Sequence, residues 1–504
     1  MRTVKVSVRR LVEFLLRSGD IDASSSAAGE LDAMQLGSDG HRRLQAMAEG
    51  PYQAEVPLAR FFYFPQGQLV PAALRMDVPA EAVEKSDPTG WFLRLEGRAD
   101  GVIDVPAGVT VDEIKGTYAD VSQMEGPRPV HVAQARCYAY LYLRELQAKA
   151  HDATFRRTDP VTVQMTYVGL ETGEVRRFSE VLWFQDLEGW FLDLLADYHR
   201  WMGPRQDHLR RRDEALRQLA FPFPWRPGQE ALANRVARTV GQGGRLYLQA
   251  PTGSGKTVAC LWPSLRCMGE GQGERLAYLT AKTVARQAAV DCLDLLNGRG
   301  ARVVAVSLTA RERICPIVRG RRESSLRSAG RSAPCNPVEC PYARGHFDRI
   351  GEVAHGLLSA SEGGSVLGRA EVLAAAERHR VCPYELQLDL ADWADAVVCD
   401  YNYAFRPSST LRCLGDDPRR AILLVDEAHN LVDRARELYS AELVGGSFAR
   451  VAAAHRREGR AEGGQQAGAL GRVAAWFGEG GRCWAGTGQA RTAARPAGGG
   501  AWAT

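Results

Sequence analysis

The chain has 504 residues, of which 45% are hydrophobic and 25% charged. This length exceeds one ordinary hydrophobic core, so we expect two or more domains. No apolar run approaches the roughly 20 residues needed to cross a bilayer, which excludes a membrane partner and predicts a cytoplasmic protein. The net charge of +4 is too small to indicate nucleic-acid binding by itself. Eleven cysteines without a signal peptide favour thiols or metal ligands over disulfides.

Residues 1–202 alternate segments that are typical of strands and helices. Apolar positions from Val8 to Leu16 recur at helical spacing, and Ser7 is suited to cap that helix. The pattern then predicts neighbouring strands at 91–105 and 109–116, a helix at 130–146, a strand at 161–170 and a helix at 186–202. Gly203-Pro204 and the arginine-rich segment that follows predict an interdomain linker over 203–220.

A second α/β region is predicted over 221–440. Apolar strands at 245–249, 275–281, 301–308, 395–400 and 421–425 alternate with helical stretches, which is typical of a parallel sheet. A cysteine- and arginine-rich insertion interrupts this pattern from about 311 to 385. After about residue 457 the chain turns to Gly, Ala and Arg with little periodicity.

The segment AlaProThrGlySerGlyLysThr at 250–257 has the context of a phosphate-binding loop, because it follows an apolar strand and precedes an apolar helix. Gly253 and Gly255 would let backbone N–H groups surround the phosphates of ATP. Lys256 is expected to reach the β- and γ-phosphates, and Thr257 to bind Mg²⁺. Ala250 stands where the general motif has glycine.

The second half of an ATP site is predicted at AspGluAlaHis, 426–429, which follows the last apolar strand. Asp426 is expected to hold Mg²⁺ through water, and Glu427 to polarise the attacking water. Upstream, Arg226 and Gln229 are expected near the adenine.

Four cysteines in the insertion predict a metal site: Cys315, Cys335, Cys340 and Cys382 have the spacing C-x19-C-x4-C-x41-C. Three of them precede proline, which removes competing N–H groups and stiffens the ligand loops. Four thiolates alone do not distinguish zinc from an iron–sulfur cluster, although this spacing fits no short zinc-finger pattern.

The same insertion is basic, with seven arginines and two glutamates from Arg311 to Arg331. Such a run is often a solvated face, but it is also what contact with phosphates requires. We expect Arg319, Arg321 and Arg322 to guide single-stranded DNA at the point where strands separate.

In the N-terminal region, Asp100 ends the GlyArgAlaAsp segment of one predicted strand, and Glu113 and Lys115 share a face of the next. Two carboxylates can bind Mg²⁺ or Mn²⁺ to activate water for phosphodiester attack, and the lysine can stabilise the developing charge. Gln134 and Tyr138 lie one turn apart on the following predicted helix. The pattern is loose, and an ordinary charged hairpin is the alternative.

The order of the phosphate loop, YLTAKTVARQ at 278–287, four cysteines, CDYNYAF at 399–405 and VDEAHNL resembles the iron–sulfur helicases of the XPD/DinG family, in superfamily 2. The resemblance covers about 221–440. It implies a RecA-like lobe, a [4Fe–4S] cluster, 5′→3′ unwinding of DNA, and contacts of Thr280 and Arg286 with the DNA backbone.

The N-terminal pattern resembles RecB-type nucleases of the PD-(D/E)XK superfamily, because a histidine, G-x-x-D, E-x-K and Q-x-x-x-Y occur in that order. The resemblance implies a restriction-endonuclease-like α/β domain over 1–202. It makes His41, predicted at the start of a helix, a metal ligand, and it assigns Gln134 and Tyr138 to the DNA and metal site.

A motor of this superfamily has a second RecA-like lobe that supplies an arginine. We expect this chain to lack that lobe and therefore to unwind little or no DNA. The resemblance implies that an arch-like region starts within 441–504. The tail, with 13 glycines among its last 54 residues, resembles a disordered end or, as we prefer, an out-of-frame translation.

Three functions compete: a helicase–nuclease in DNA repair or replication acting on single-stranded or branched DNA, a nuclease whose motor half only grips DNA, and a non-enzymatic iron–sulfur DNA-binding protein. The third is disfavoured by the presence of Lys256, Asp426, Glu427, Asp100, Glu113 and Lys115. Protein partners and oligomeric state are not indicated.

Overall fold

The computed structural model describes residues 2–22, 40–47, 50–65, 77–78, 90–106, 108–149, 160–251, 253–323, 335–406, 409–415 and 420–440. The chain divides into two compact units, Met1–His429 and Asn430–Thr504. In the second unit the described residues form one helix, α15 (Asn430–Leu438), and the two residues after it. The predicted Gly-, Ala- and Arg-rich tail lies outside the described residues.

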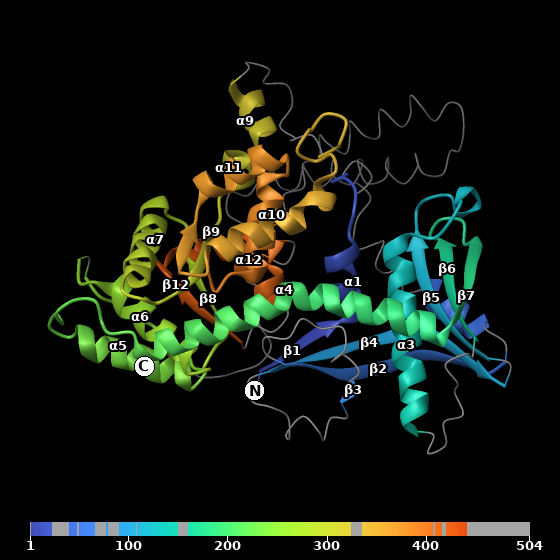
Figure 1. Cartoon of the computed structure of the whole chain (residues 1–504). Helices are drawn as coiled ribbons and strands as arrows, with labels where there is room; N and C mark the ends of the chain where they lie inside the picture. Colours follow the sequence, from blue (N-terminus) through green and yellow to red (C-terminus); the bar gives the residue numbers. More distant parts are fainter. Residues whose placement is uncertain are drawn as a thin grey trace, which may run out of the picture. The chain divides into compact units, whose positions relative to one another are not determined.

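The first unit begins with a mixed sheet in the order β3-β2-β4-β5-β6-β7, with β1 paired in parallel to β4 (Figure 1). Its strands are β1 (Arg2–Ser7), β2 (Tyr52–Phe64), β3 (Asp77–Val78), β4 (Trp91–Val105), β5 (Gly108–Thr117), β6 (Pro160–Gly169) and β7 (Val175–Trp183). The predicted strand pair is confirmed, because β4 and β5 form an antiparallel hairpin in which Gly101 pairs with Asp112.

Three helices pack on this sheet around an apolar core: α1 (Val8–Leu16), α3 (Pro129–Lys149) and α4 (Phe184–Gln218). Ser7 caps α1 as predicted, since its hydroxyl accepts a hydrogen bond from the amide of Arg10. On α3, the ring of Tyr140 stacks on Phe191 of α4 with centroids 4.0 Å apart. The three helices and the strands of the sheet therefore share one apolar core.

A second sheet is entirely parallel, as predicted, in the order β10-β9-β11-β8-β12. Its strands are β8 (Arg275–Leu279), β9 (Val304–Ser307), β10 (Ser365–Leu367), β11 (Ala396–Cys399) and β12 (Ala421–Val425). The helices of this region are α5 (Gln229–Gly241), α6 (Lys256–Gly269), α7 (Thr283–Gly298), α8 (Arg311–Ile314), α9 (Pro316–Glu323), α10 (His346–Ala360), α11 (Arg369–His379), α12 (Pro383–Trp393), α13 (Asn402–Phe405) and α14 (Arg412–Gly415).

The residues expected to form a linker are helical instead. Helix α4 runs without interruption from the first sheet through Pro204 to Gln218, so 203–218 form its second half. Proline removes one backbone hydrogen bond from a helix. Ion pairs to the second sheet hold this half of α4 in place.

Those ion pairs converge on Asp395, which is fully buried just before β11. Its carboxylate accepts hydrogen bonds from Arg205 at 2.7 Å and Arg212 at 2.6 Å, and lies 2.8 Å from Nε2 of His208. The backbone amide of Val304 also donates to it, at 2.9 Å. Burial acts to raise the pKa of Asp395, but its arginine and histidine partners outweigh burial, and the pKa is held well below its usual range.

The strand expected at 245–249 is not formed. These residues are extended without a ladder, and Tyr247 is 90% exposed. Among the described strands, β12 lies at one edge of the sheet and is followed by the acidic loop, Asp426 and Glu427. Its Leu423 is 41% exposed. An edge strand gains hydrogen bonds on one side only, so the apolar pattern of residues 245–249 was not sufficient by itself to form a strand.

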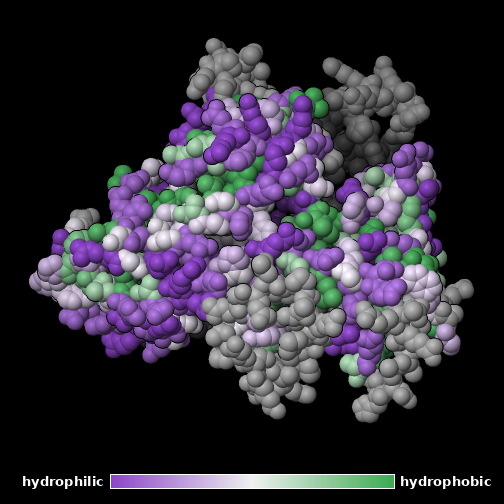
Figure 2. Space-filling view, viewed as in Figure 1, coloured by the Kyte–Doolittle hydropathy of each residue, from purple (hydrophilic) through white to green (hydrophobic). Residues whose placement is uncertain are grey.

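Hydrophilic residues cover most of the face seen in Figure 2, with smaller apolar patches between them. No helix in the described ranges is long and apolar enough to span a membrane.

Candidate nucleotide, cysteine and nuclease sites

The candidate phosphate loop contains two glycines with left-handed backbone, Gly253 and Gly255, and Gly255 is the N-cap of α6. A Cβ atom at Gly255 would also lie 2.3 Å from Nε2 of Gln229, so this position needs glycine twice over. The ammonium of Lys256 donates to the carbonyl of Ala250 at 2.8 Å. The loop is therefore folded back on itself, with its lysine at its centre.

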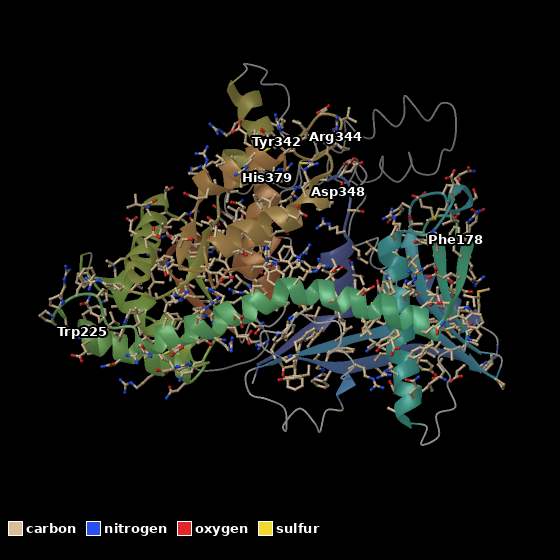
Figure 3. The ribbon with its side chains drawn as sticks, in the orientation of Figure 1. Phe178, Trp225, Tyr342, Arg344, Asp348 and His379 are labelled. Carbon is tan, nitrogen blue, oxygen red and sulfur yellow. The ribbon has the colours of Figure 1, made fainter. Side chains whose placement is uncertain are left out.

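The two residues expected near adenine contact this loop. Arg226 donates to the carbonyl of Gly253. Buried Gln229 accepts from the amide of Arg226 at 3.2 Å and donates to the carbonyl of Gly255 at 3.4 Å. Trp225, labelled in Figure 3, precedes them and stacks on Phe221 at a centroid distance of 3.6 Å. The segment 221–229 is thus bound to the phosphate loop through backbone carbonyls.

The acidic residues lie at the end of β12, at the same sheet edge as the loop. The hydroxyl of Tyr278 donates to Oδ2 of Asp426 at 2.8 Å and also interacts with Thr257. Burial, followed by Asp426, raises the pKa of Tyr278. The two side chains expected at Mg²⁺ therefore share one tyrosine, the first residue of the YLTAK segment, whose role the motif pattern did not predict.

Glu427 has a left-handed backbone with φ of 54°. Its carboxylate lies 3.5 Å from Lys282 and 3.5 Å from His429. The hydroxyl of Tyr401, fully buried, donates to the carbonyl of Asp426 and to that of Glu427 at 3.1 Å. Tyr401 lies in the CDYNYAF segment, so that segment positions the acidic loop.

The residues expected to contact DNA are placed differently from one another. Thr280 is fully buried, and its hydroxyl accepts from the amide of Lys282 at 3.3 Å, so a direct contact with DNA through its side chain is not supported. Arg286 is partly buried and donates to the carbonyl of Leu308 at 2.9 Å. Arg319 is exposed on α9. Arg321 and Arg322 follow on α9, and their side chains lie outside the described part of the chain.

The four cysteines of the insertion lie on neighbouring loops and helix starts. Burial raises the pKa of Cys335, Arg311 opposes this, and Cys340 and Cys315 raise it further, so these thiols are near one another. Burial also raises the pKa of Cys382, to about 12, with Cys335 contributing. Arg311 donates to the Sγ atom of Cys335 at 2.8 Å.

The surroundings of these thiols are basic. Tyr342 and Arg344, both labelled in Figure 3, follow Cys340, and Arg349 bridges the carbonyls of Arg344 and Arg380 at 2.6 and 2.8 Å. A guanidinium aimed at sulfur fits a thiolate ligand, since such a donor stabilises thiolate charge. Among the residues that the structure describes, however, the four thiols do not stand in the arrangement of a metal site.

Strands β4 and β5, helix α3 and the helical segment 40–47 bring together the six residues of the candidate nuclease site: His41, Asp100, Glu113, Lys115, Gln134 and Tyr138. The ammonium of Lys115 donates to Oε1 of Glu113 at 2.6 Å and to Oε1 of Gln134 at 3.3 Å. Gln134 in turn donates to the hydroxyl of Tyr138 at 3.3 Å. Oδ2 of Asp100 accepts from the amide of Ile114 at 2.8 Å.

His41 lies in a helical segment, 40–47, as predicted, and its Nδ1 is 3.6 Å from Oδ1 of Asp100. Burial lowers the pKa of His41, but the hydrogen bond and charge of Asp100 outweigh this and the pKa is raised. Gln45 of the same segment donates to the carbonyl of Asp100 at 2.9 Å. A histidine 59 positions away in sequence thus reaches the candidate carboxylates.

Two glycines of the GlyArgAlaAspGly segment make room for tyrosine rings. A Cβ atom at Gly97 would lie 2.6 Å from the ring of Tyr138, and one at Gly101 would lie 1.9 Å from the hydroxyl of Tyr52. Both glycines lie inside β4, which continues to Val105. The absence of a side chain at Gly97 therefore leaves room for the ring of Tyr138 at the site.

The Glu113 side chain fits a divalent metal. It is 1% exposed, and its Oε2 atom is buried without a partner. Burial raises its pKa to about 8, with Asp100 adding to the rise and Lys115 opposing it. A nearby cation would satisfy this oxygen and favour its ionised form. Within the described residues, however, no three His, Cys, Asp or Glu side chains already stand in the arrangement of a metal site.

Comparison with known proteins bears on the second sheet. Residues 282–447 match the DEAD_2 family model. Residues of this chain are 24% identical over 232 positions to the "General transcription and DNA repair factor IIH helicase subunit XPD" of Dictyostelium discoideum, covering 42% of this chain and 29% of that protein. The subunit of the same name from Arabidopsis thaliana is 22% identical over 221 residues, covering 41% and 29%. The chain thus spans under a third of the length of these relatives, and the matched region is XPD-like.

Solved structures titled "Truncated XPD" and "XPD_Helicase" are each 17% identical, with TM-scores of 0.30 and 0.29. They cover 50% and 45% of this chain, and the chain covers 65% and 37% of them. TM-scores this low do not establish a shared fold, so the XPD-like assignment depends on the sequence matches.

Proposed function

We propose that this chain carries the ATP-binding lobe of an XPD-type 5′→3′ DNA helicase joined to a metal-dependent DNA nuclease, acting in repair or replication. The observation that carries the motor half is the shared contact of Tyr278 with Thr257 and Asp426. It brings the end of the phosphate loop and the acidic loop to one point, where a magnesium nucleotide needs both.

In this proposal the loop amides and Lys256 hold the phosphates, Thr257 and Asp426 hold Mg²⁺, and Glu427 orients the attacking water. The metal would supply charge neutralisation at the β- and γ-phosphates. Tyr401 keeps Glu427 in its left-handed conformation by bonding the carbonyls of the acidic loop. Arg286 and Arg319 are proposed contacts with the DNA backbone.

The nuclease half is supported by the convergence of His41, Asp100, Glu113 and Lys115 across three separate segments. The carboxylates and His41 would hold Mg²⁺ or Mn²⁺, which supplies an activated water for phosphodiester hydrolysis. Lys115, held by Gln134, would stabilise the charge that develops on the phosphate. The hydroxyl of Tyr138 accepts a hydrogen bond from the amide of Gln134 and so orients that side chain.

We propose that the four cysteines hold a [4Fe–4S] cluster. Their spacing in the sequence and the contact of Arg311 with Cys335 support thiolate ligands, and zinc is the alternative. Protein purified without oxygen and assayed for iron, acid-labile sulfide and zinc distinguishes the two, because only a cluster contains sulfide.

The function is tested by cleavage of single-stranded and flapped DNA with Mn²⁺, with and without ATP. Lys115→Ala is the nuclease variant, and Lys256→Ala is the nucleotide variant. Cleavage that Lys115→Ala abolishes, together with Mg²⁺-dependent ATP binding that Lys256→Ala abolishes, supports the proposal. Absence of both activities in the unaltered chain would overturn it.

A second candidate is a nuclease whose motor half only grips DNA. This candidate is favoured because all six candidate nuclease residues lie between His41 and Tyr138, and none of them belongs to the phosphate loop. Cleavage of equal rate with and without ATP would select this function.

A further inference from the structure

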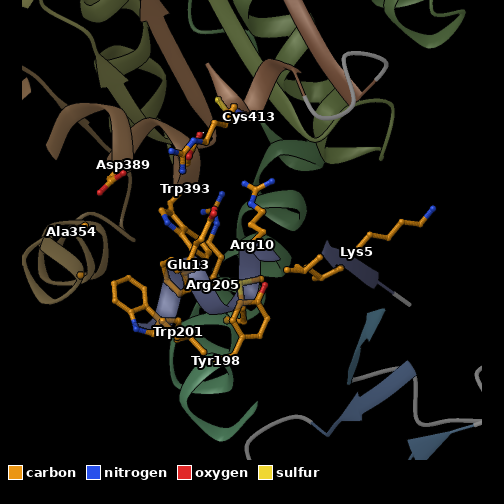
Figure 4. A pocket seen from close by; sticks show the side chains of 18 of the residues that line it. Lys5, Arg10, Glu13, Tyr198, Trp201, Arg205, Ala354, Asp389, Trp393 and Cys413 are labelled. Atoms are coloured by element: carbon orange, nitrogen blue, oxygen red, sulfur yellow. The ribbon is translucent and has the colours of Figure 1, made fainter. Parts of the chain in front are cut away.

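A large cavity lies between the elements of the two sheets within the first unit. It has a volume of about 1180 Å³ and is lined by residues of β1, α1, α4, α10, α12 and α14, by the loop at 271–274 and by Arg420 (Figure 4). Small-molecule sites usually enclose roughly 300–1,000 Å³. Its size therefore favours a segment of a polymer over a single small molecule.

Aromatic rings form one wall of the cavity. The ring of Phe14 lies 5.0 Å from that of Trp201 and 5.1 Å from that of Trp393, and the two tryptophan rings are 6.0 Å apart. All three side chains are only partly buried. Figure 4 shows Trp201 and Trp393 near Tyr198 and Glu13. Partly exposed rings of this kind are platforms on which bases stack.

The remaining lining is basic in balance, with nine Lys and Arg against six Asp and Glu. The guanidinium of Arg17 lies 3.5 Å from the centroid of the Phe347 ring. Burial raises the pKa of Asp389 to about 7, Asp392 adds to this, and Arg17 opposes it. Near neutral pH this carboxyl therefore loses part of its negative charge, which leaves the cavity more positive.

The residues that line the cavity do not include those of the candidate nuclease site, and the link to that site is made through the starts of α1 and α3. Arg9 and Val130, at the beginnings of α1 and α3, both line it. Arg9 is exposed and interacts electrostatically with Glu113 and Tyr138. At its other limit the cavity is lined by Arg275 and Arg420, beside β8 and β12 of the second sheet.

We propose that this cavity holds a short stretch of single-stranded DNA, with bases against Trp201 and Trp393 and phosphates against Arg17 and Arg412, and directs the strand along Arg9 to the nuclease centre. The proposal rests on the proposed DNA function and deepens it, because it names a path between the motor and nuclease regions. Neither resemblance stated above supplies these residues.

The first test uses the whole unaltered chain. An oligothymidylate of about 16 nucleotides, with 5-bromodeoxyuridine at single positions, is crosslinked by light, and the crosslinked peptides are identified by mass spectrometry. Crosslinks in peptides that contain Trp201, Trp393 or residues 9–17 support the path. Crosslinks confined to peptides that do not line the cavity overturn it.

The second test measures affinity for the same oligonucleotide over a range of salt concentrations. Trp393→Leu should weaken binding by about 5- to 150-fold, the effect of losing one stacking contact. Arg412→Gln should reduce the slope of log K against log salt by about 0.7, as for one phosphate on a single strand. Trp183→Leu and Arg238→Gln, outside the cavity, are the matched controls and should change neither quantity.

Circular dichroism establishes that each variant is folded. Unchanged affinity and slope in folded cavity variants would overturn the path while leaving the DNA function intact. Failure of the unaltered chain to bind or cut any DNA would instead overturn the proposed function itself, so the two failures are distinguishable.

Discussion

Replacing Asp395 by asparagine removes the charge on which three side chains of α4 converge. Arg205, His208 and Arg212 would keep their positions around a neutral amide, and the Arg212 side chain is only 2% exposed. Removing one partner of a buried ion pair costs about 3–5 kcal/mol, because a buried charge is left without compensation. Since a domain is stable by only about 5–15 kcal/mol, this loss is large.

The assay is urea unfolding of the second sheet, followed by far-ultraviolet circular dichroism and by hydrogen exchange of the Val304 amide, which bonds to Asp395. With a slope of about 2–3 kcal/mol per molar urea, the midpoint should fall by roughly 1–2 M. The matched control is Asp207→Asn on the same helix, where the pair with Arg210 is about half exposed. Its cost should be under about 1 kcal/mol.

The effect must also depend on pH in one direction. The folded-state pKa of Asp395 is lowered, so its contribution to stability is present above the unfolded pKa of about 3.9 and is lost as pH falls below it. The difference between the unaltered chain and Asp395→Asn should therefore be constant from pH 7 to about 5 and shrink at lower pH. Equal midpoints for Asp395→Asn and Asp207→Asn, or a difference that grows on acidification, would refute the reasoning.

Three further substitutions have defined outcomes. Gly97→Ala places a methyl group 2.6 Å from the buried Tyr138 ring and should cost about 1–3 kcal/mol in thermal unfolding, whereas Gly189→Ala, with open space at its Cβ, should be neutral or stabilising. Lys256→Ala should weaken binding of a fluorescent magnesium nucleotide by at least about 10-fold, or roughly 1.4 kcal/mol, and equal affinity would show that the lysine does not reach the phosphates. Cys382→Ser should lower the iron content of anaerobically purified protein, while Cys292→Ser, a buried thiol on α7, should leave it unchanged; equal loss in both would remove the cysteine assignment.

Local pattern was sufficient where a feature is built from neighbouring residues. The helix at Val8–Leu16 with its Ser7 cap, the hairpin of β4 and β5, and the parallel strands β8, β9, β11 and β12 follow from periodicity and turn residues. The grouping of Asp100 with Glu113 also follows, because a hairpin places its two strands side by side. The motif order predicted the XPD-like region, which the comparisons confirm.

Features that depend on contacts distant in sequence were not predictable in this way. Arg205 and Asp395 are 190 positions apart, and a polar, arginine-rich segment with Gly203-Pro204 carries the signals of a linker. Its helix is held by charges that only the folded chain brings together. Thr280 was expected at DNA from its motif, but a threonine directly after an apolar strand is equally suited to burial, and the structure buries it.

The position of Asp395 has a mechanical consequence. It stands immediately before β11, and only β11 and Asp400 separate it from Tyr401, whose hydroxyl bonds the acidic loop. An extended strand rises about 3.3 Å per residue and has almost no slack to absorb a pull along its length. A displacement of α4 at Arg212 must therefore either separate the ion pairs or slide β11 as a unit. In the second case, tension applied to the helix would be delivered to the residues proposed to hold magnesium.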